Sequence, residues 1–196
     1  EFRRVLFRSA SVALALPAFP VFFLSQVMSA FDRAIGTTFY NAKMGGSLWL
    51  YENLFWLMGH PEVYVILIPA VAALMEMVPV FTRRPLFSFR IAVMGIAGIA
   101  GLSALVWAHH MYISGWAPLL NAPFMLTTEL ISIPTGMLFL VIVGTLWRGR
   151  QWMTVPLASV YALLWNFMIA GITGIYLSDV PRSEEHTSGL QSHSFI

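Results

Sequence analysis

Residues 54–80 read LFWLMGHPEVYVILIPAVAALMEMVPV, and the only carboxylates or imidazoles in this apolar run are His60, Glu62 and Glu76. About 20 apolar residues in a helix are enough to cross the ~30 Å hydrocarbon core of a bilayer. The run does not alternate between apolar and polar residues as a barrel strand does. It therefore predicts a transmembrane helix.

The composition of the whole chain supports the same class. Its 196 residues are 58% hydrophobic and 10% charged, and the mean hydropathy is +0.75. A soluble domain carries about 25% charged residues, so this chain cannot cover a water-facing surface. This composition excludes a soluble enzyme, a disordered chain and a nucleic-acid-binding protein. The net charge of +2 does not indicate nucleic-acid binding, because so few charged residues remain to form a basic patch. The absence of cysteine excludes disulfide scaffolds, iron–sulfur clusters and thiolate metal sites.

Four further apolar stretches have a similar length, and breaks that carry turn residues and charges separate them. The sequence contains no repeat of 20–50 residues. The chain is therefore predicted to be all-α, a polytopic transmembrane bundle of about five helices. The five expected spans are 10–31, 54–80, 91–113, 123–147 and 155–178.

The two ends of the chain differ from the spans in composition. Residues 1–9, EFRRVLFRS, hold three arginines, and residues 182–196, RSEEHTSGLQSHSFI, are polar and without pattern. Both strings resemble translated sequencing-adapter read-through, and the alternative is a basic amphipathic arm and a disordered tail. We expect non-native scars at both ends of a transmembrane fragment at 10–181. His186 and His193 are therefore left out of the candidate site.

The arginines predict the orientation of the bundle. Five of them lie in the loops at 81–90 and 148–151, whereas the opposite loops hold only Arg33 and Lys43. Positive residues favour the cytoplasmic side of a membrane. We therefore expect loops 81–90 and 148–151 on the cytoplasmic or matrix side, so that the second helix runs inward and the third runs outward.

This orientation brings three histidines to a similar depth. His60 lies about two turns below the outer start of the second helix, and His109 and His110 lie at the outer end of the third. Ionisable residues inside a membrane are costly and point to function. Three imidazoles suit copper, zinc or iron, and a three-ligand site leaves the open position of a catalytic metal. Tyr64 lies ~6 Å farther in on the same helix face, and Thr135 reaches a comparable depth. The alternative is a structural role, in which His60 only forms a hydrogen bond to another helix. The histidine pair makes this alternative less favoured, because it supplies two further metal ligands at the same depth.

Three motifs, GHPEVY at 59–64, VWAHHM at 106–111 and IPTG at 133–136, resemble subunit I of the haem–copper oxygen reductases. The match is closest to the aa3-type cytochrome c oxidases and covers roughly Ser11 to Pro181. The resemblance implies the fifth to ninth helices of a twelve-helix subunit. It also implies a parent enzyme, a cytochrome c oxidase that reduces O₂ to water with copper (CuB) and haem and translocates protons.

The resemblance assigns roles to individual residues. His60, His109 and His110 match the three ligands of CuB. Tyr64 matches the tyrosine covalently linked to the ligand histidine, here His60, which supplies an electron and a proton during O–O cleavage. Glu62 matches the glutamate at the end of the D proton pathway. The residues that match the family's aromatic and polar neighbours of the copper site are Trp56, Trp107, Thr128 and Thr135.

The second proton pathway of the family, the K pathway, is altered in this sequence. Thr135 would belong to it, but Leu138 stands where the family carries lysine and Met75 where it carries serine. The usual K pathway is therefore expected to be absent. Glu76 is a candidate for a substitute proton entrance. Alternatively, its carboxylate only extends to the membrane interface and takes no part in proton transfer. Glu129 either forms a hydrogen bond between packed helices or carries protons, and the sequence favours neither role.

The haem ligands of the family come from an earlier helix and from a later HxH segment, and this chain contains neither. Its three membrane histidines all match copper ligands, so none remains to bind a haem axially. We expect the chain alone to be inactive. The expected partners are other oxidase subunits, especially the electron-accepting subunit II, with cytochrome c or a quinol, O₂ and membrane lipid. A bacterial plasma membrane is favoured over the mitochondrial inner membrane.

Two other functions stay open at this stage. A nitric oxide reductase of the same superfamily also places three histidines beside a haem, but it lacks a tyrosine at the position of Tyr64. A non-redox proton- or ion-conducting bundle could use Glu62, Glu76 and Glu129, but it has no evident need of two adjacent imidazoles. Cytochrome c is the expected electron donor, although this stretch does not distinguish it from a quinol.

Overall fold

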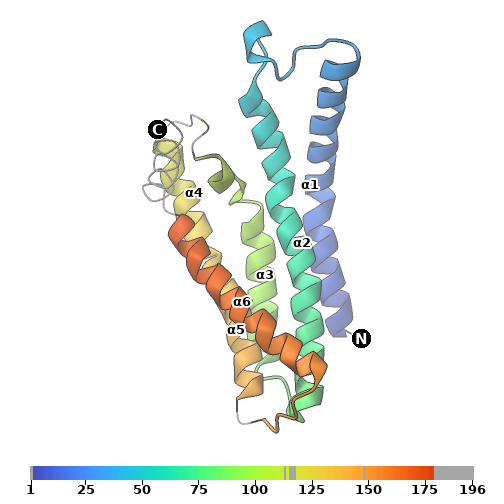
Figure 1. Cartoon of the computed structure of the whole chain (residues 1–196), viewed down its shortest axis with the longest axis vertical. Coiled ribbons are helices and arrows are strands. Elements are labelled where there is room, and N and C mark those ends of the chain that lie inside the picture. The colour runs from blue at the N-terminus through green and yellow to red at the C-terminus, as the bar shows by residue number, and fades with distance from the viewer. Residues whose placement is uncertain (1, 113, 115–117, 148, 179–196) are drawn as a thin grey trace, which may run out of the picture.

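The computed structural model describes residues 2–112, 114, 118–147 and 149–178, and these residues form helices joined by short loops (Figure 1). No strand occurs in the described ranges, so the predicted all-α class is confirmed. In chain order the elements are α1 (Phe2–Ala34), the 3₁₀ turn η1 (Ala42–Met44), α2 (Leu48–Thr82), α3 (Phe89–Ser103), the 3₁₀ turn η2 (Trp107–Met111), α4 (Pro118–Leu130), α5 (Ser132–Leu146) and α6 (Val155–Leu177).

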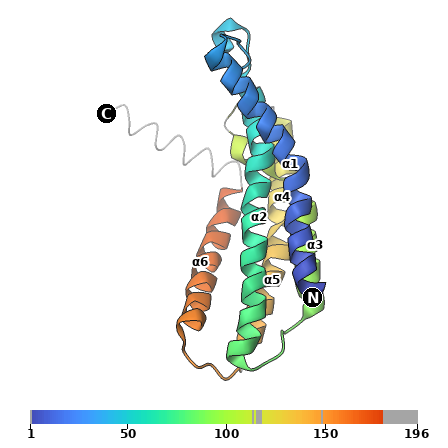
Figure 2. The same cartoon turned by 90° about the vertical axis from the view of Figure 1, so that its right-hand side faces the viewer.

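Membrane-length helices make up most of the structure. α1 and α2 form a long antiparallel hairpin, and α2 lies between α1 and α6 (Figure 2). At 15 residues, α3 is a shorter apolar helix. The chain is therefore a helical membrane bundle, as predicted. The stretches long and apolar enough to cross a membrane are Ser9–Ala34, Leu48–Thr82, Asn121–Leu146 and Val155–Leu177.

α2 is the helix on which the other elements assemble. The hydroxyl of Ser47 accepts a hydrogen bond from the Leu50 N–H at 3.2 Å and caps its start. The helix ends at Thr82, and the capping residue Arg83 takes the left-handed conformation with φ of 51°. Between these ends its apolar residues pack against α3, α5 and α6. The buried core includes Ile68, Met75, Val78, Ile99, Val141 and Leu157.

The prediction of one helix over 91–113 is wrong. α3 ends at Ser103, and Trp107–Met111 form the separate turn η2. The Ser103 hydroxyl donates to the Ala100 carbonyl oxygen at 3.2 Å, a local bond that competes with helix continuation. Three glycines within α3 also lower its helix propensity. The histidine pair therefore lies on a tight turn beyond the helix.

The predicted span 123–147 is present, but it is interrupted. α4 ends at Leu130 and α5 begins at Ser132. Pro134 has no N–H to donate to the Leu130 carbonyl oxygen, so one bond of the helical ladder is missing at this point. The interruption is short, because Asn121–Leu146 still forms one membrane-length stretch.

The loop after α2 and the loop after α5 lie together at one end of the bundle, at the bottom of Figure 1. Arg84 Nη1 donates to the Trp147 carbonyl oxygen at 2.8 Å, and the Phe87 N–H donates to Thr145 Oγ1 at 3.0 Å. Which side of a membrane this end faces stays a prediction.

Some predictions concern residues that the structure does not describe. Arg148 and the tail that contains His186 and His193 lie outside the described residues. The predicted scar boundaries, 1–9 and 182–196, stay predictions.

Candidate metal centre

Three imidazoles converge between α2 and η2. His60 projects from the middle of α2 and is only 5% exposed, and His109 and His110 follow one another on η2. His60 Nδ1 lies 3.2 Å from His110 Nε2, and His109 Nε2 lies 3.0 Å from the same atom. One ring nitrogen from each histidine lies within 4.8 Å of the other two. The structure thus brings together the three histidines that the sequence singled out.

The spacing of these nitrogens suits a single metal ion. Three nitrogens held ~2.0–2.1 Å from one ion at tetrahedral angles lie ~3.3–3.4 Å apart. Without an ion, one N–H on His110 Nε2 could serve only one of its two neighbours. A cation would instead attract the lone pairs of His60, His109 and His110 together.

Thr128 of α4 sets the tautomer of His109. Its hydroxyl donates to the Phe124 carbonyl oxygen at 2.6 Å, so its own hydrogen is already used. His109 Nδ1 lies 3.0 Å from Thr128 Oγ1 and must therefore donate to it. A neutral His109 then carries no hydrogen on Nε2, the nitrogen that faces His110. A residue that does not itself touch the metal commonly orients a metal-binding imidazole in this way.

Two tryptophans pack around η2 and its neighbours. Trp56 stacks on His110 with ring centroids 3.9 Å apart and an angle of 7° between the planes. Trp107 lies edge-on to Phe124, with centroids 5.1 Å apart, and its Nε1 donates to Asn53 Oδ1 at 3.4 Å. The contacts of Trp107 connect η2 to both α2 and α4. The stacking of Trp56 restricts the orientation of His110.

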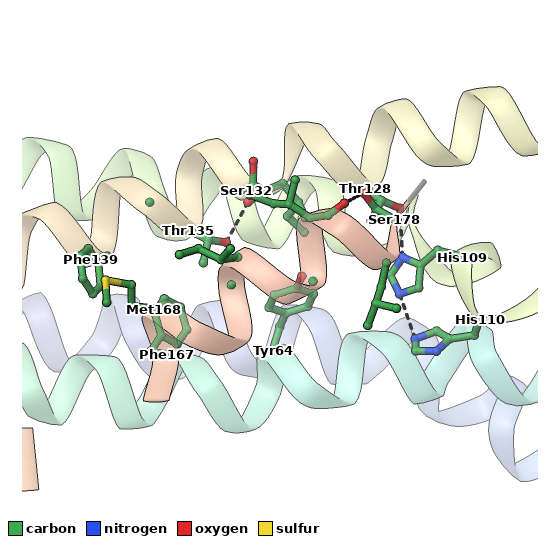
Figure 3. A pocket seen from close by; sticks show the side chains of 17 residues that line it. Tyr64, His109, His110, Thr128, Ser132, Thr135, Phe139, Phe167, Met168 and Ser178 are labelled. Atoms are coloured by element: carbon green, nitrogen blue, oxygen red, sulfur yellow. Dashed lines mark hydrogen bonds between the residues drawn. The ribbon is translucent and has the colours of Figure 1, made fainter. Parts of the chain in front are cut away.

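A cavity of about 550 Å³ opens beside the histidine pair (Figure 3). It runs from His109 and His110, past Tyr64, towards Phe139 and Met168. Its polar groups gather at the histidine end, and most of its wall is apolar, as is usual in sites for organic cofactors. The residues that α4 and α5 contribute near the histidines include Thr128, Ser132 and Thr135.

Comparison with known proteins places the chain in a family. Residues 4–184 match the family model described as Cytochrome C and Quinol oxidase polypeptide I. The chain belongs to this family. The predicted resemblance to oxidase subunit I is thereby confirmed.

Relatives in this family are identical to the chain at more than a third of the aligned positions. It is 37% identical over 188 residues to the alternative cytochrome c oxidase subunit 1 of Bradyrhizobium diazoefficiens, covering 89% of this chain and 32% of that protein. It is 37% identical over 166 residues to the cytochrome c oxidase subunit 1 of Bacillus subtilis, covering 85% and 27%. It is 39% identical over 161 residues to the quinol oxidase subunit 1 of the same species, covering 82% and 25%. The chain thus spans a quarter to a third of the length of these oxidase subunits.

Tyr64 lies against His60 in this oxidase segment. The two rings form an edge-to-face pair with centroids 4.9 Å apart, and Tyr64 also lines the cavity. His60 Nε2 is buried and has no hydrogen-bond partner in the described part of the chain. A buried polar atom without a partner is costly and needs an explanation.

The three carboxylates that the sequence singled out lie apart from the histidines. Glu62 is exposed, because it lies two residues after His60 and therefore on the opposite face of α2. Glu76 and Glu129 are also exposed, and neither is among the described residues that line the cavity. The structure therefore does not bring Glu62, Glu76 or Glu129 to the site.

The two positions that the resemblance links to an altered K pathway are packed with apolar atoms. Leu138 and Met75 are 3% and 2% exposed and belong to one buried core. Leu138 also packs tightly against α3, since a Cβ added to Gly95 would lie 2.6 Å from Leu138 Cδ2. No polar side chain replaces the lysine and serine of the family at these two positions.

Sequence reasoning missed several residues around the site. Asn53 accepts the hydrogen bond from Trp107, and Glu52, one residue earlier, has a buried Oε2 with no hydrogen-bond partner among the described residues. α6 supplies one wall of the cavity, and nothing in its apolar sequence distinguishes the residues on that wall. They include Phe167, Met168 and Ser178.

Proposed function

We propose that the full-length parent of this chain is a haem–copper terminal oxidase that reduces O₂ to water and translocates protons. The observation that carries the proposal is the convergence of three imidazole nitrogens, with Tyr64 beside them, at the end of an apolar cavity. A non-redox ion-conducting bundle does not account for this convergence. Copper analysis of the histidine variants described in the Discussion tests the proposal.

The residues present fit a copper ion. His60, His109 and His110 would hold it, and Thr128 would keep Nε2 of His109 free to bind it. Bound copper supplies one-electron redox chemistry. Imidazole is a ligand that copper accepts well, and no thiolate or carboxylate competes for the described cluster.

Tyr64 is proposed as the source of a proton and an electron during O–O cleavage. Tyr64 is suited to this role because its ring packs edge-on against His60, whose buried Nε2 has no hydrogen-bond partner in the described part of the chain. The same tyrosine argues against a nitric oxide reductase.

The cavity also fits a haem, because it is large, mostly apolar and adjacent to His109 and His110. All histidines among the described residues belong to the copper cluster, so the axial ligand must come from another part of the parent. We therefore propose that the chain alone binds no haem and reduces no oxygen.

Replacing Thr128 with valine should lower the copper affinity of the full-length oxidase about 10–100-fold, which is typical for the loss of an outer residue that orients a ligand. Valine keeps the shape of threonine but cannot accept the hydrogen of His109 Nδ1. Copper retention during titration with a chelator measures the effect.

Thr127→Val is the matched control, because the Thr127 hydroxyl bonds to the backbone oxygens of Leu105 and Phe124 and to no histidine of the described cluster. It should retain copper as the unmodified oxidase does. Equal copper loss in the two variants would show that Thr128 acts only through the packing of α4.

Protons are proposed to reach the site through Glu62 rather than through the packed K-pathway positions. Glu62→Gln should lower oxygen reduction on the order of 100-fold, and Glu76→Gln by less than about tenfold. Glu62 lies on the face of α2 opposite His60 but within one turn of it, whereas Glu76 lies about four helical turns away along α2, so the proton path from Glu62 is the shorter one. Oxygen consumption of the purified variants, at unchanged copper content, is the measurement. An equal or larger loss in Glu76→Gln would make the inner end of α2 the main entrance.

The proposed electron donor is cytochrome c, received through subunit II, in a bacterial plasma membrane. Two of the relatives above are cytochrome c oxidase subunits, and one is a quinol oxidase subunit, which keeps a quinol as the second candidate. Reduction of the purified oxidase by cytochrome c or by a quinol, measured side by side, distinguishes the two donors. We further propose that the loops at 81–90 and 148–151 face the cytoplasm.

A further inference from the structure

We propose that the loops after α2 and after α5 together form a binding site for the headgroup of an anionic phospholipid. This arginine–tryptophan surface lies at the end of the bundle that is lowest in Figures 1 and 2. Its described members are Arg83, Arg84, Arg90, Trp147, Arg150 and Trp152.

The two loops form one surface because they are bonded to each other. Arg84 Nη1 donates to the Trp147 carbonyl oxygen at 2.8 Å, and Phe87 N–H donates to Thr145 Oγ1 at 3.0 Å. Gly149 also lies close to the end of α2, since a Cβ added there would be 2.8 Å from Thr82 Cβ. These contacts hold the arginines of both loops at one end of the bundle.

The charge of this surface is uniformly positive. Residues 83–90 and 147–154 contain no aspartate or glutamate, and the nearest acidic residue in the sequence is Glu76, within α2. Arg83, Arg90 and Arg150 are exposed. Arg84 is exposed too, and only one of its nitrogens donates to Trp147. Guanidinium groups bind phosphate through paired, charge-assisted hydrogen bonds.

The aromatic residues place this charge at the level of lipid headgroups. Trp147 and Trp152 are 67% and 82% exposed, and they flank the ends of the membrane-length stretches Asn121–Leu146 and Val155–Leu177. Tryptophan favours the membrane–water interface, where its ring contacts the acyl boundary and its N–H meets water. A phospholipid offers both a phosphate for the arginines and an apolar boundary for the indoles. A soluble acidic partner offers only the first.

The opposite end of the bundle provides a contrast. There Arg33 and Lys43 share the α1–α2 hairpin with Asp32, whose carboxylate accepts hydrogen bonds from the Phe39 and Tyr40 N–H groups. Glu52 lies just inside the start of α2. The hairpin end therefore carries mixed charge, and removal of its two cations serves as a control of equal charge change.

The test uses the assembled, delipidated full-length oxidase and dioleoyl phosphatidylglycerol, with dioleoyl phosphatidylcholine as the neutral comparison. Binding is followed by native mass spectrometry. The double variant Arg83→Gln with Arg150→Gln should weaken phosphatidylglycerol binding on the order of tenfold, because each cation near a membrane surface contributes to anionic-lipid attraction. Arg84 is kept, since it also bonds Trp147.

The controls show whether a loss of phosphatidylglycerol binding is specific to the arginine–tryptophan surface. Arg33→Gln with Lys43→Gln should leave phosphatidylglycerol binding unchanged. Arg83→Lys with Arg150→Lys should weaken it less than the Gln variant does, because lysine keeps the charge but not the paired hydrogen bonds. Phosphatidylcholine binding should not change in any variant. Unchanged phosphatidylglycerol binding in the Gln variant, or equal loss in the hairpin control, would overturn the proposal. Equal competition by soluble glycerol phosphate would also overturn it, because the site would then bind free phosphate rather than lipid.

Discussion

Replacing His110 with alanine in the full-length oxidase should remove its copper. The copper affinity should fall by more than the ~10–100-fold expected for loss of a residue that only orients a ligand, such as Thr128. His110 Nε2 is the atom that both other histidines approach, at 3.0 and 3.2 Å. Oxygen reduction should be lost with the metal. Metal analysis of the purified variant, alongside oxygen consumption, measures both effects. His109→Ala should behave in the same way.

Asn53→Ala is the matched control for the histidine variants. Asn53 lies on α2 and contacts the site only through its bond to Trp107, so this variant should keep its copper. Full copper content in His110→Ala would contradict the assignment of the three histidines as ligands. A haem absorption band that disappears in the variants while copper remains would assign the histidines to the haem instead.

Replacing Tyr64 with phenylalanine should lower oxygen reduction at least about 100-fold, the usual effect of losing a positioned proton donor. Copper content should stay nearly unchanged, because phenylalanine keeps the edge-to-face contact with His60, whose ring centroid is 4.9 Å away. The variant therefore separates the hydroxyl group from the packing of the ring. Oxygen consumption and copper content of one preparation are the two measurements.

Tyr51→Phe, on the same helix, controls for the general effect of removing a hydroxyl group. Tyr51 stacks on Phe55, with ring centroids 5.7 Å apart, and is not among the described residues that line the cavity. It should leave oxygen reduction within about twofold of the unmodified oxidase, as expected for a group that takes no part in proton transfer. Most activity retained in Tyr64→Phe would mean that Tyr64 serves only to pack against His60.

Hydrophobic length was a reliable guide to the spans but not to their interruptions. The predicted span 155–178 nearly coincides with α6, whereas the predicted 91–113 contains a helix, a break and a 3₁₀ turn. Hydropathy measures solubility in lipid, and it is almost the same for a helix and for a tight turn of the same residues. The interruption before Pro134 had a local signal, the missing N–H, that length alone does not register.

Residue type alone did not separate the site from the rest of the chain. Glu62 is two positions from His60 in the sequence, yet the helical turn places it on the opposite face and away from the cavity. Phe167 and Met168 line that cavity from α6, more than 100 residues after His60. Apolar residues of this kind occur throughout the spans, so no local pattern marks the ones that face a cofactor.

The sequence by itself determined the class of the protein and the approximate spans, because membrane insertion depends on local hydropathy. It also determined the three histidines and Tyr64, because each of the two histidine motifs is an unbroken run of residues. Only the tertiary structure decided that His60 and His109 each place a nitrogen 3.0–3.2 Å from His110 Nε2, that Thr128 sets the tautomer of His109, and that α6 forms one wall of the cavity. These features depend on distances and hydrogen bonds between helices far apart in the chain. Such distances follow from packing, which no single segment specifies.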